Sequence, residues 1–596
     1  MEDVLRIGGA CGFWGESPQA TAQLLAVPGL DALVYDYLAE ITMSILARAR
    51  QKDAALGYAT DFVTQAMAPN LARIAETGVK ILSNAGGVNP MACADALRAE
   101  IAKAGLALKV AVVEGDDLLP RIGDYAGCVE MFSGAPMPAA DRIVSANAYL
   151  GAAPVAAALR AGADIVITGR CADSALTLAA AMAGFGWGRE EFDLLAAGSL
   201  AGHLIECGPQ ASGGNFTDWR QAGDIARIGY PVVEIARDGS FTLTKPAGTS
   251  GLVTPATVGE QMLYEIGDPR AYLLPDVTCD FSGVELVQAG PDRVRVTGAK
   301  GRAPSGRLKV SVTWQDGWRG GHVLFFNGME AEAKARAYAG AVLERVGGML
   351  GKMGAADFRE TLVETFGGRP GEGEYQEIAL KLAVRHDDPR AVGLFLREAV
   401  GMGLATPPGL HFFTGAGRPK PSPVVALFSF LVDAADLDIR VTLEAAPVPF
   451  APLHPSVIPD VLPAVPEPAA PEAMDQQMTT RPLLELAWAR SGDKGDASNI
   501  GVIARHPAYL PWIWAALTPE AVAEVFAVEN RGRIDRFFLP GSGTMNILMY
   551  NALGGGGIAS LRNDAQGKGF AQKLLATPVR LPAGLIANDV AEGGRE

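Results

Sequence analysis

Several short segments in the first third of the chain combine carboxylates, amides or an arginine with glycine-rich turns. Carboxylates can act as general acids or bases, and an arginine can bind a carboxylate or phosphate through two hydrogen bonds. Glycine lets a backbone turn tightly or approach a ligand closely. These residue types indicate a site for a small anionic or carboxylic substrate. The segments are GGACG (8–12), DYLAE (36–40), NAGGVNP (84–90), EGDD (114–117), Asn147 and GRCAD (169–173).

A second group of reactive residues lies in GHLIECGPQASGGNFTDW, residues 202–219. Glu206 or Cys207 could serve as a general base or a nucleophile. The adjacent Gly213 and Gly214 would let the backbone come close to a ligand. His203 has no triad partner beside it in the sequence, so we interpret it as a structural histidine.

SGDKGD, residues 491–496, is a third polar segment, and it lies between two apolar runs. Lys494 could bind an anion, whereas Asp493 and Asp496 could bind a cation. Alternatively, the segment is a hydrogen-bonded plug at a domain or subunit seam, in which Lys494 pairs with an aspartate. The sequence leaves both roles open.

Structural roles compete with several of these assignments. Glu40 could simply stabilise the first turn of a helix, and Arg170 could belong to a structural ion pair. GGACG lacks the spacing of a dinucleotide fingerprint or a P-loop, so its glycines could serve only a tight turn. We predict Glu40, Asp173, Glu206 and Cys207 as catalytic residues. The predicted substrate-binding residues are Gly8, Gly9, Gly12, Asp36, Asn84, Gly86, Gly87, Asn147, Arg170, Gly213, Gly214, Asp493, Lys494 and Asp496.

Short apolar runs precede the polar segments of the first third and are typical of strands buried on both faces. They cover residues 4–8, 32–35, 79–83, 108–114, 142–146 and 164–168, with helical patterns such as 41–50, 69–77 and 91–104 between them. This alternation predicts an α/β fold with a mostly parallel, doubly wound sheet. Ligands bind beyond the carboxyl ends of the strands in such sheets, so we expect the polar segments to meet there.

The rest of the chain divides by composition. Residues 230–330 alternate apolar and polar side chains and predict an antiparallel β insertion. A proline-rich stretch is typical of an extended linker. We therefore predict an α/β domain over 1–446, a linker over 447–480, a small α+β sandwich over 481–586 and a tail over 587–596.

Composition excludes several classes of function. A net charge of −15 makes nucleic acid an unexpected partner. No apolar run approaches the roughly 20 residues of a membrane helix, and the N-terminus does not resemble a signal peptide, so we expect a cytoplasmic protein. The scattered cysteines indicate buried thiols, not a disulfide framework. No HxH or HExxH spacing supports a histidine metal site, but an oxygen-ligand site for Mg²⁺ stays open.

Longer motifs resemble one family. DYLAEITMSILAR, ILSNAGGVNP, IECGPQASGGNFTDW and YEIGDPRAYLLPDV are similar to the acyclic terpene utilisation AtuA-like family. ARSGDKGDASNIGV and FLPGSGTMNILMYNALGGGG resemble the ferredoxin-fold module that is commonly fused to it. The resemblance covers residues 5 to about 582 apart from the linker, and it implies a ferredoxin-like fold for the C-terminal sandwich.

The resemblance implies a catabolic enzyme of acyclic terpenoid breakdown, a route that works on CoA thioesters of citronellol- and geraniol-type compounds. We expect a lyase or hydratase acting on a branched acyl-CoA or related carboxylic substrate, with Lys494 available for a phosphate of CoA. The chain lacks the metal-binding HxH of 3-hydroxy-3-methylglutaryl-CoA lyases, so its site would be built differently. The alternative is a non-catalytic scaffold or binding subunit for partner enzymes. We expect a homo-oligomer, a dimer or larger.

Overall fold

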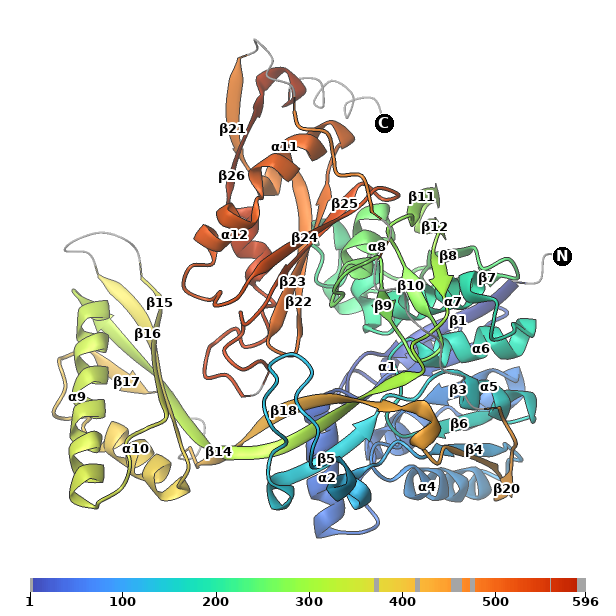
Figure 1. Cartoon of the computed structure of the whole chain (residues 1–596), viewed down its shortest axis with the longest axis horizontal. Coiled ribbons are helices and arrows are strands. Elements are labelled where there is room, and N and C mark those ends of the chain that lie inside the picture. The colour runs from blue at the N-terminus through green and yellow to red at the C-terminus, as the bar shows by residue number, and fades with distance from the viewer. Residues whose placement is uncertain are drawn as a thin grey trace. The chain divides into compact units, whose positions relative to one another are not determined.

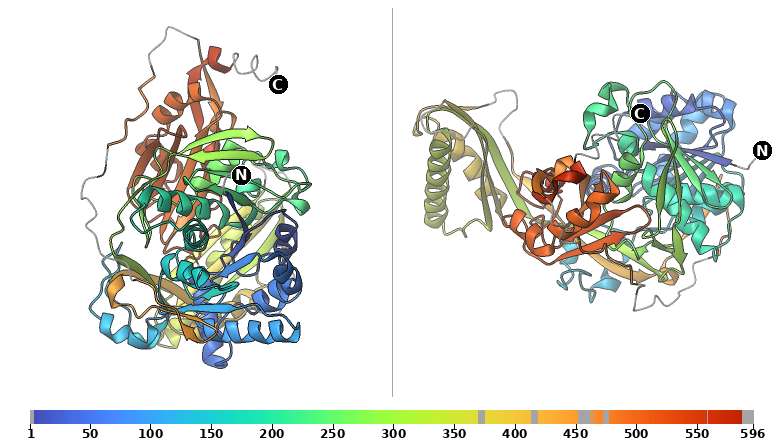
Figure 2. Two further views of the ribbon diagram at one scale, coloured as in Figure 1. Left: turned by 90° about the vertical axis from the view of Figure 1, so that its right-hand side faces the viewer. Right: turned by 90° about the horizontal axis from the view of Figure 1, so that it is seen from above.

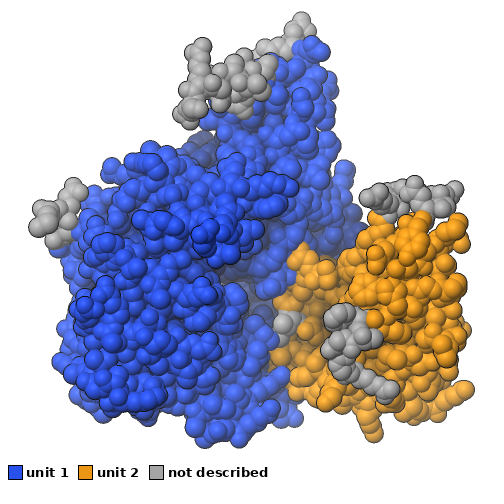
Figure 3. All heavy atoms as spheres, turned by 180° about the vertical axis from the view of Figure 1, so that it is seen from behind, with its two compact units in different colours: residues 1–313, 427–552, 566–596 blue, residues 314–426, 553–565 orange. Residues whose placement is uncertain are grey.

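The chain forms two compact units, which Figure 3 shows in different colours. The computed structural model describes residues 4–368, 375–412, 419–451, 462, 464–471, 477–557 and 559–586. Residues 452–461, 463 and 472–476 of the predicted linker, and the predicted tail 587–596, lie outside the described residues. Unit 1 comprises Met1–Thr313, Leu427–Ala552 and Gln566–Glu596, and unit 2 comprises Trp314–Ala426 and Leu553–Ala565.

Unit 1 is organised around an 11-stranded sheet with a parallel centre (Figure 1). The sequence predicted all of these central strands as short apolar runs, and they pair in parallel as expected. Their carboxyl ends therefore lie along one edge of the sheet, where a ligand site is expected. In sheet order they are β1 (Val4–Cys11), β2 (Ala32–Tyr35), β3 (Lys80–Ser83), β6 (Ile165–Thr168) and β4 (Val110–Glu114).

Antiparallel strands extend this sheet on both sides. From β1, the sheet continues through β7 (Val232–Ala236), β8 (Phe241–Thr244), β12 (Arg293–Thr297) and β11 (Glu285–Gly290). From β4, it continues through β19 (Arg440–Leu443) and β20 (Ala446–Pro447). A separate three-stranded sheet contains β13 (Lys300–Arg302), β10 (Thr278–Asp280) and β9 (Tyr272–Leu273). The predicted combination of a large sheet with parallel strands and an antiparallel insertion is thus confirmed.

Helices cover both faces of the parallel strands (Figure 1 and Figure 2). Alternate strand residues, such as Val110 and Val112, belong to one apolar core with the first four α-helices, because successive strand side chains point to opposite faces. The next three helices contact the same sheet from outside that core. The first set is α1 (Gln19–Leu25), α2 (Glu40–Lys52), α3 (Leu71–Thr77) and α4 (Pro90–Lys103), and the second is α5 (Ala153–Arg160), α6 (Ala175–Phe185) and α7 (Phe192–Ile205).

One predicted strand pairs elsewhere. The apolar run at 142–146 forms β5 (Ile143–Ala148), which pairs with the long strand β14 (Arg307–Gly328) instead of joining the parallel sheet. The hydroxyls of Ser145 and Thr313 hydrogen-bond across this pair at 2.6 Å. A short apolar run predicts a buried strand but carries no information about its partner. Strand β18 (Ser422–Asp433) also pairs with β14.

The C-terminal part of unit 1 is a small α+β sandwich, as predicted. Its antiparallel sheet has the order β22 (Ala487–Lys494), β23 (Ala497–Ala504), β25 (Thr544–Met549) and β24 (Ile534–Leu539). The SGDKGD segment is mostly strand, because β22 and β23 pair up to Lys494 and Ala497 and leave only Gly495 and Asp496 as the hairpin loop. The accompanying elements are α11 (Leu510–Ala516), α12 (Pro519–Val525), α13 (Phe570–Leu575), β21 (Met478–Pro482) and β26 (Pro578–Pro582).

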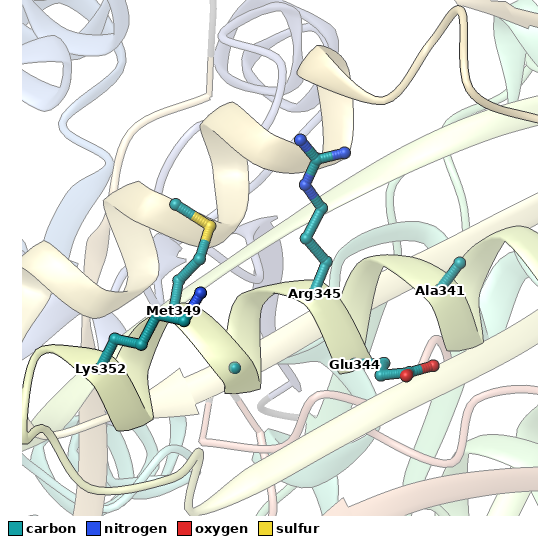
Figure 4. Close-up of a pocket in the computed structure, with 6 residues that line it drawn as sticks. Ala341, Glu344, Arg345, Met349 and Lys352 are labelled. Atoms are coloured by element: carbon teal, nitrogen blue, oxygen red, sulfur yellow. The ribbon is translucent and has the colours of Figure 1, made fainter.

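Unit 2 packs two helices on an antiparallel sheet. Its apolar core joins α9 (Ala331–Lys352) and α10 (Pro389–Gly401) to β15 (Glu360–Gly367), β16 (Gln376–His386) and the second half of β14, beside which β17 (Leu410–Phe412) pairs. A pocket lies along α9 (Figure 4). It holds no cluster of carboxylates, so it does not resemble the predicted site. Its lining residues are Ala341, Glu344, Arg345, Gly348, Met349 and Lys352.

No helix within the described ranges combines the length and the apolar character that a membrane crossing requires.

Candidate functional site

Three carboxylates from separate elements of unit 1 converge. Asp36 follows β2, Asp173 lies in the loop after β6, and Glu206 ends α7. One oxygen of each lies within 4.8 Å of the others. Asp36 is buried, whereas the side chains of Asp173 and Glu206 keep 32% and 10% of their surface exposed. We call these three residues the acid centre, and its partial exposure leaves it open to a small molecule.

Two of the predicted glycines bring the end of α7 to the sheet. A Cβ at Gly9 would lie 2.1 Å from the carbonyl oxygen of Ile205, and one at Gly12 would lie 2.8 Å from the backbone of Cys207. No side chain fits in such a space, so β1 can approach α7 only with glycine at both positions. These glycines therefore fix the position of Glu206 relative to the sheet.

Asp36 is held by a neighbouring amide. The Nδ2 of Asn84, just after β3, donates to Oδ1 of Asp36 at 2.5 Å, and the Oδ1 of Asn84 accepts from the backbone N–H of Tyr37 at 2.7 Å. Burial raises the pKa of Asp36 well above its usual range, and the charge of Asp173 raises it further, although Arg170 opposes both. Asp36 therefore favours the protonated form and can donate a proton.

Glu206 forms a buried pair with a histidine. Its Oε1 lies 3.1 Å from Nδ1 of His203, whose Nε2 lies 3.2 Å from the carbonyl oxygen of Met262. When Glu206 is ionised, both ring nitrogens face oxygen acceptors, and this arrangement favours the imidazolium form. Burial disfavours this charge, but the charge of Glu206 and the hydrogen bond to it raise the pKa of His203 overall. Burial also raises the pKa of Glu206, with His203 opposing the shift.

Arg170 supplies a buried positive charge. Its Nη1 donates to Oδ1 of Asp173 at 2.8 Å and to the carbonyl oxygen of Cys171 at 3.0 Å. Its guanidinium carbon lies 4.1 Å from the ring centroid of Tyr149, a cation–π distance. Its Nε is buried without a hydrogen-bond partner in the described part of the chain.

Asp116 holds the backbone of Arg170 and the side chain of Asn147 by hydrogen bonds. The Oδ2 of Asp116 accepts from the backbone N–H of Arg170 and from Nδ2 of Asn147, both at 2.8 Å. A Cβ at Gly169 would lie 2.2 Å from Asp116, so this close approach requires the glycine. Burial raises the pKa of Asp116 to about 7.

Glu40 belongs to a second charged group beside the acid centre. Its Oε1 accepts from the hydroxyl of Tyr149 at 2.6 Å and lies 3.4 Å from Nζ of Lys309, on β14. Burial opposes the charge on Glu40, but Lys309 and Arg170 lower its pKa overall. Glu40 is thus a fixed anion that holds these cations in place.

Lys494 brings a charge from the ferredoxin-like sandwich to the same place. It is exposed, and its Nζ lies 5.6 Å from the ring centroid of Tyr272. Interaction with Tyr272 raises its pKa, and Asp173, Glu265 and Glu206 act in the same direction. The ring of Tyr272 in turn lies 5.9 Å from that of His203, the partner of Glu206, which places the ammonium group near the acid centre.

The neighbours of Lys494 in the hairpin have different contacts. Asp493 accepts from Nζ of Lys568 at 3.0 Å, and this lysine also donates to Glu265 at 2.9 Å. Burial raises the pKa of Asp493 to about 6. Asp496 lies in the hairpin loop, where its carbonyl oxygen accepts from Ala552.

The remaining predicted residues pack against protein atoms. Burial raises the pKa of Cys207 well above its usual range, so this residue is a neutral thiol at neutral pH. The predicted glycines other than Gly9 and Gly12 also contact protein where a Cβ would be. Gly8 faces Leu24 and Leu33, Gly86 faces Thr168 and Pro90, Gly87 faces Leu46 and Gly57, Gly213 faces Leu252 and Ala222, and Gly214 faces Pro209.

Sequence reasoning missed several residues of this region. Tyr149 lies two positions after the predicted Asn147, and Glu265 and Tyr272 belong to the YEIGDPRAYLLPDV motif. Their proximity to a predicted residue or to a family motif could have identified them as candidates. The sequence predicts a structural role for His203, whereas the structure pairs it with Glu206. Lys309 lies in an alternating strand pattern that gives no indication of a site, and only the pairing of β14 with β5 places it there.

The three acid-centre oxygens also fit a metal ion. Mg²⁺ prefers carboxylate oxygens and keeps several waters, so a few ligands on a partly open site are sufficient. Asp36, Asp173 and Glu206 provide such oxygens and no softer ligand. The site can therefore perform proton transfer by itself or hold a hard divalent cation.

Comparison with known families agrees with this architecture. The family model described as acyclic terpene utilisation family protein AtuA matches residues 5–443, and that of the AtuA ferredoxin-like domain matches residues 481–580. No curated protein and no solved structure matches the chain. Because the first match alone covers well over half of its length, the chain belongs to the acyclic terpene utilisation AtuA family.

Proposed function

We propose that the chain is a lyase or hydratase that acts on a branched acyl substrate, such as a CoA thioester formed during acyclic terpenoid breakdown. The convergence of Asp36, Asp173 and Glu206 is the observation that carries the proposal. Membership of a family described by acyclic terpene utilisation supports the substrate class. Carboxylates with different environments, gathered beside buried cations, are typical of acid–base catalysis.

Cleavage of a 3-hydroxyacyl thioester makes three demands on such a site. A base removes the proton of the 3-hydroxyl group, and the oxygen then forms a double bond to C3 as the C2–C3 bond breaks. The electron pair of that bond moves onto the thioester carbonyl oxygen and gives an enolate. C2 then accepts a proton, which leaves a carbonyl compound and a shorter acyl thioester. The site needs a base, a stabiliser of the enolate oxygen and an acid.

The residues of the site fit these roles. Glu206 is the base, because His203 stabilises its ionised form at 3.1 Å. Asp36 is the acid, because burial favours its protonated form. Asp173 positions Arg170, whose charge lies beside the acid centre. Hydration of an α,β-unsaturated thioester uses the same pair: Glu206 takes a proton from water, the hydroxide adds to C3, and Asp36 protonates C2.

A divalent cation on the same oxygens would supply Lewis-acid polarisation of the substrate. Addition of Mg²⁺ or EDTA to the purified protein distinguishes the metal-free mechanism from the metal-assisted one. Activity that survives EDTA supports acid–base catalysis without metal, and activity that depends on Mg²⁺ supports the metal-assisted version.

The test is a turnover assay with the full chain on branched 3-hydroxyacyl-CoA and enoyl-CoA thioesters, read by mass spectrometry. We expect Asp36→Asn and Glu206→Gln to lower kcat by about 100-fold or more, as loss of an acid or base does. Asp95→Asn is the control, since Asp95 is an exposed partner of Arg98 on α4. Wild-type activity in both variants would refute the site. A wild-type protein without turnover that binds a stoichiometric partner enzyme would instead favour a scaffold.

A further inference from the structure

The ferredoxin-like sandwich, which is part of unit 1, is hydrogen-bonded to one segment of the preceding α/β region. Nδ2 of Asn499 donates to the carbonyl oxygen of Leu263 at 2.5 Å, and its Oδ1 accepts from the N–H of Glu265 at 2.9 Å. Nδ2 of Asn546 donates to the carbonyl oxygens of Ile266 and Gly267, at 3.0 and 2.7 Å. Two buried amides thus bind the backbone of residues 263–267, which defines the position of β23 and β25.

Glycines make this contact close. A Cβ at Gly501 would lie 2.4 Å from the side chain of Leu263, and one at Gly492 would lie 2.6 Å from that of Glu265. Glu265 itself has a left-handed backbone with φ of 57°, an uncommon conformation for this residue type. The hairpin of β22 and β23 therefore lies directly on the segment that leads to Tyr272.

A buried ion pair also joins the ferredoxin-like sandwich to this part of unit 1. The Nε of Arg490, on β22, lies 3.6 Å from Oε2 of Glu260, and both side chains are almost fully buried. Arg490 also donates to the carbonyl oxygen of Gly214 at 2.8 Å. Strand β22 is therefore held along its length, and its last residue, Lys494, has a defined position.

Lys494 differs from Lys568, the other lysine at this contact. Lys568 is paired with both Glu265 and Asp493. Lys494 is exposed, and no carboxylate within the described ranges lies within 4.0 Å of its Nζ. Its Nζ lies 5.6 Å from the ring centroid of Tyr272, and that ring lies 5.9 Å from the ring of His203, the partner of Glu206. An unpaired ammonium group held beside the acid centre is available to an anionic atom of a bound substrate.

We propose that Lys494 is a catalytic residue and that its ammonium group stabilises the substrate oxygen on which negative charge develops. This assignment rests on the proposed function, because it places the substrate at the acid centre. The ferredoxin-like sandwich then completes the active site instead of serving as a separate binding module. A preorganised cation beside a developing oxyanion stabilises the transition state more than the ground state, because it needs no reorganisation when charge appears.

The first test compares Lys494→Met and Lys494→Arg with wild type. A stabiliser of developing charge contributes mainly to the transition state, so K494M should lower kcat by about 100-fold with little change in KM. K494R keeps the charge and should recover part of the loss. The control is Lys573→Met, a lysine of the same sandwich that pairs with Glu529. A raised KM with unchanged kcat would show that Lys494 only binds a substrate anion such as a CoA phosphate, and it would overturn the assignment.

A second measurement does not depend on turnover. The charge of Lys494 lowers the pKa of His203, so K494M should raise the pKa of this histidine in an NMR titration, and K573M should leave it unchanged. An unchanged His203 pKa in K494M would place the ammonium outside the acid centre and refute the inference. If wild type turns over substrate and E206Q does not, a fully active K494M refutes only the role of Lys494. If wild type shows no turnover but the His203 pKa still shifts in K494M, the proposed reaction is refuted. The position of Lys494 beside the acid centre is then retained.

Discussion

The Nδ1 of His203 lies 3.1 Å from the Oε1 of Glu206 within unit 1, where His203 is buried and Glu206 keeps 10% of its side-chain surface exposed. The second ring nitrogen faces the carbonyl oxygen of Met262, so with Glu206 ionised the histidine donates to both oxygens as a cation. This pair ties the stability of unit 1 to the protonation of one histidine.

The His203 pair predicts a pH-dependent stability. Because Glu206 raises the pKa of His203 above its ordinary value of about 6.5, the pair stabilises the fold fully below that pH. The contribution is lost as the pH rises through the higher folded-state pKa. We expect His203→Gln to cost roughly 1–3 kcal/mol near pH 6, with the difference from wild type shrinking toward pH 9. Urea unfolding across that range measures it.

His322 is the matched control for this slope. Burial lowers its pKa, and its Nε2 lies 3.0 Å from the carbonyl oxygen of Leu396. Its contribution should therefore have the opposite sign, so that the difference between wild type and His322→Gln grows as the pH rises from 5 to about 7. Equal slopes for the two variants would contradict the assigned charge of His203.

Asp116 predicts a second pH effect. Burial raises its pKa to about 7, whereas an unfolded aspartate titrates near 3.9. The folded state therefore binds the extra proton, and its contribution to stability is lost as the pH rises through about 7. Asp116→Asn does not titrate, so we expect its stability relative to wild type to increase between pH 4 and 7, by at most about 1.4 kcal/mol per pH unit. Parallel pH profiles for D116N and wild type would exclude this, and exposed D95N is the reference.

Gly9 should tolerate no side chain. Gly9→Ala would place a Cβ 2.1 Å from the carbonyl oxygen of Ile205, a backbone atom that cannot rotate away. We expect a loss of at least about 1–3 kcal/mol from overpacking, together with lower activity because the end of α7 carries Glu206. In Gly127→Ala the added Cβ meets no atom within 4 Å, so the change in stability should stay within about 0.5 kcal/mol. Equal melting temperatures for the two variants would refute the close approach.

The buried pair of Arg490 and Glu260 should be costly to break from one side. Arg490→Met leaves Glu260 buried without its cation, which typically costs about 3–5 kcal/mol. The double variant Arg490→Met with Glu260→Leu removes both charges and should recover most of that loss. Denaturant unfolding of the single and double variants measures the coupling. A single variant as stable as the double would mean that the pair carries no such penalty.

Local sequence patterns predicted much of the sheet and part of the site. Short apolar runs identified the parallel strands, because a strand buried on both faces leaves a continuous apolar signature. The carboxyl ends of those strands lie on one edge, which is why Asp36, Asn84 and Arg170 were predicted to meet. The Glu206 segment was recognised from its residue types, but its distance from the sheet depends on how α7 packs against Gly9 and Gly12.

The sequence by itself determined the strands of the parallel sheet and the carboxylates that end them, because each depends on residues close together in the chain. Only the tertiary structure decided that β5 pairs with β14, that Lys309 reaches Glu40, and that Lys494 lies beside residues more than two hundred positions away. Such contacts depend on which surfaces pack together, and an alternating strand or a polar hairpin looks the same in sequence whatever it packs against. The raised pKa values of Asp36 and Asp116 could not be predicted from the sequence either. Burial causes them, and burial is a property of the folded chain.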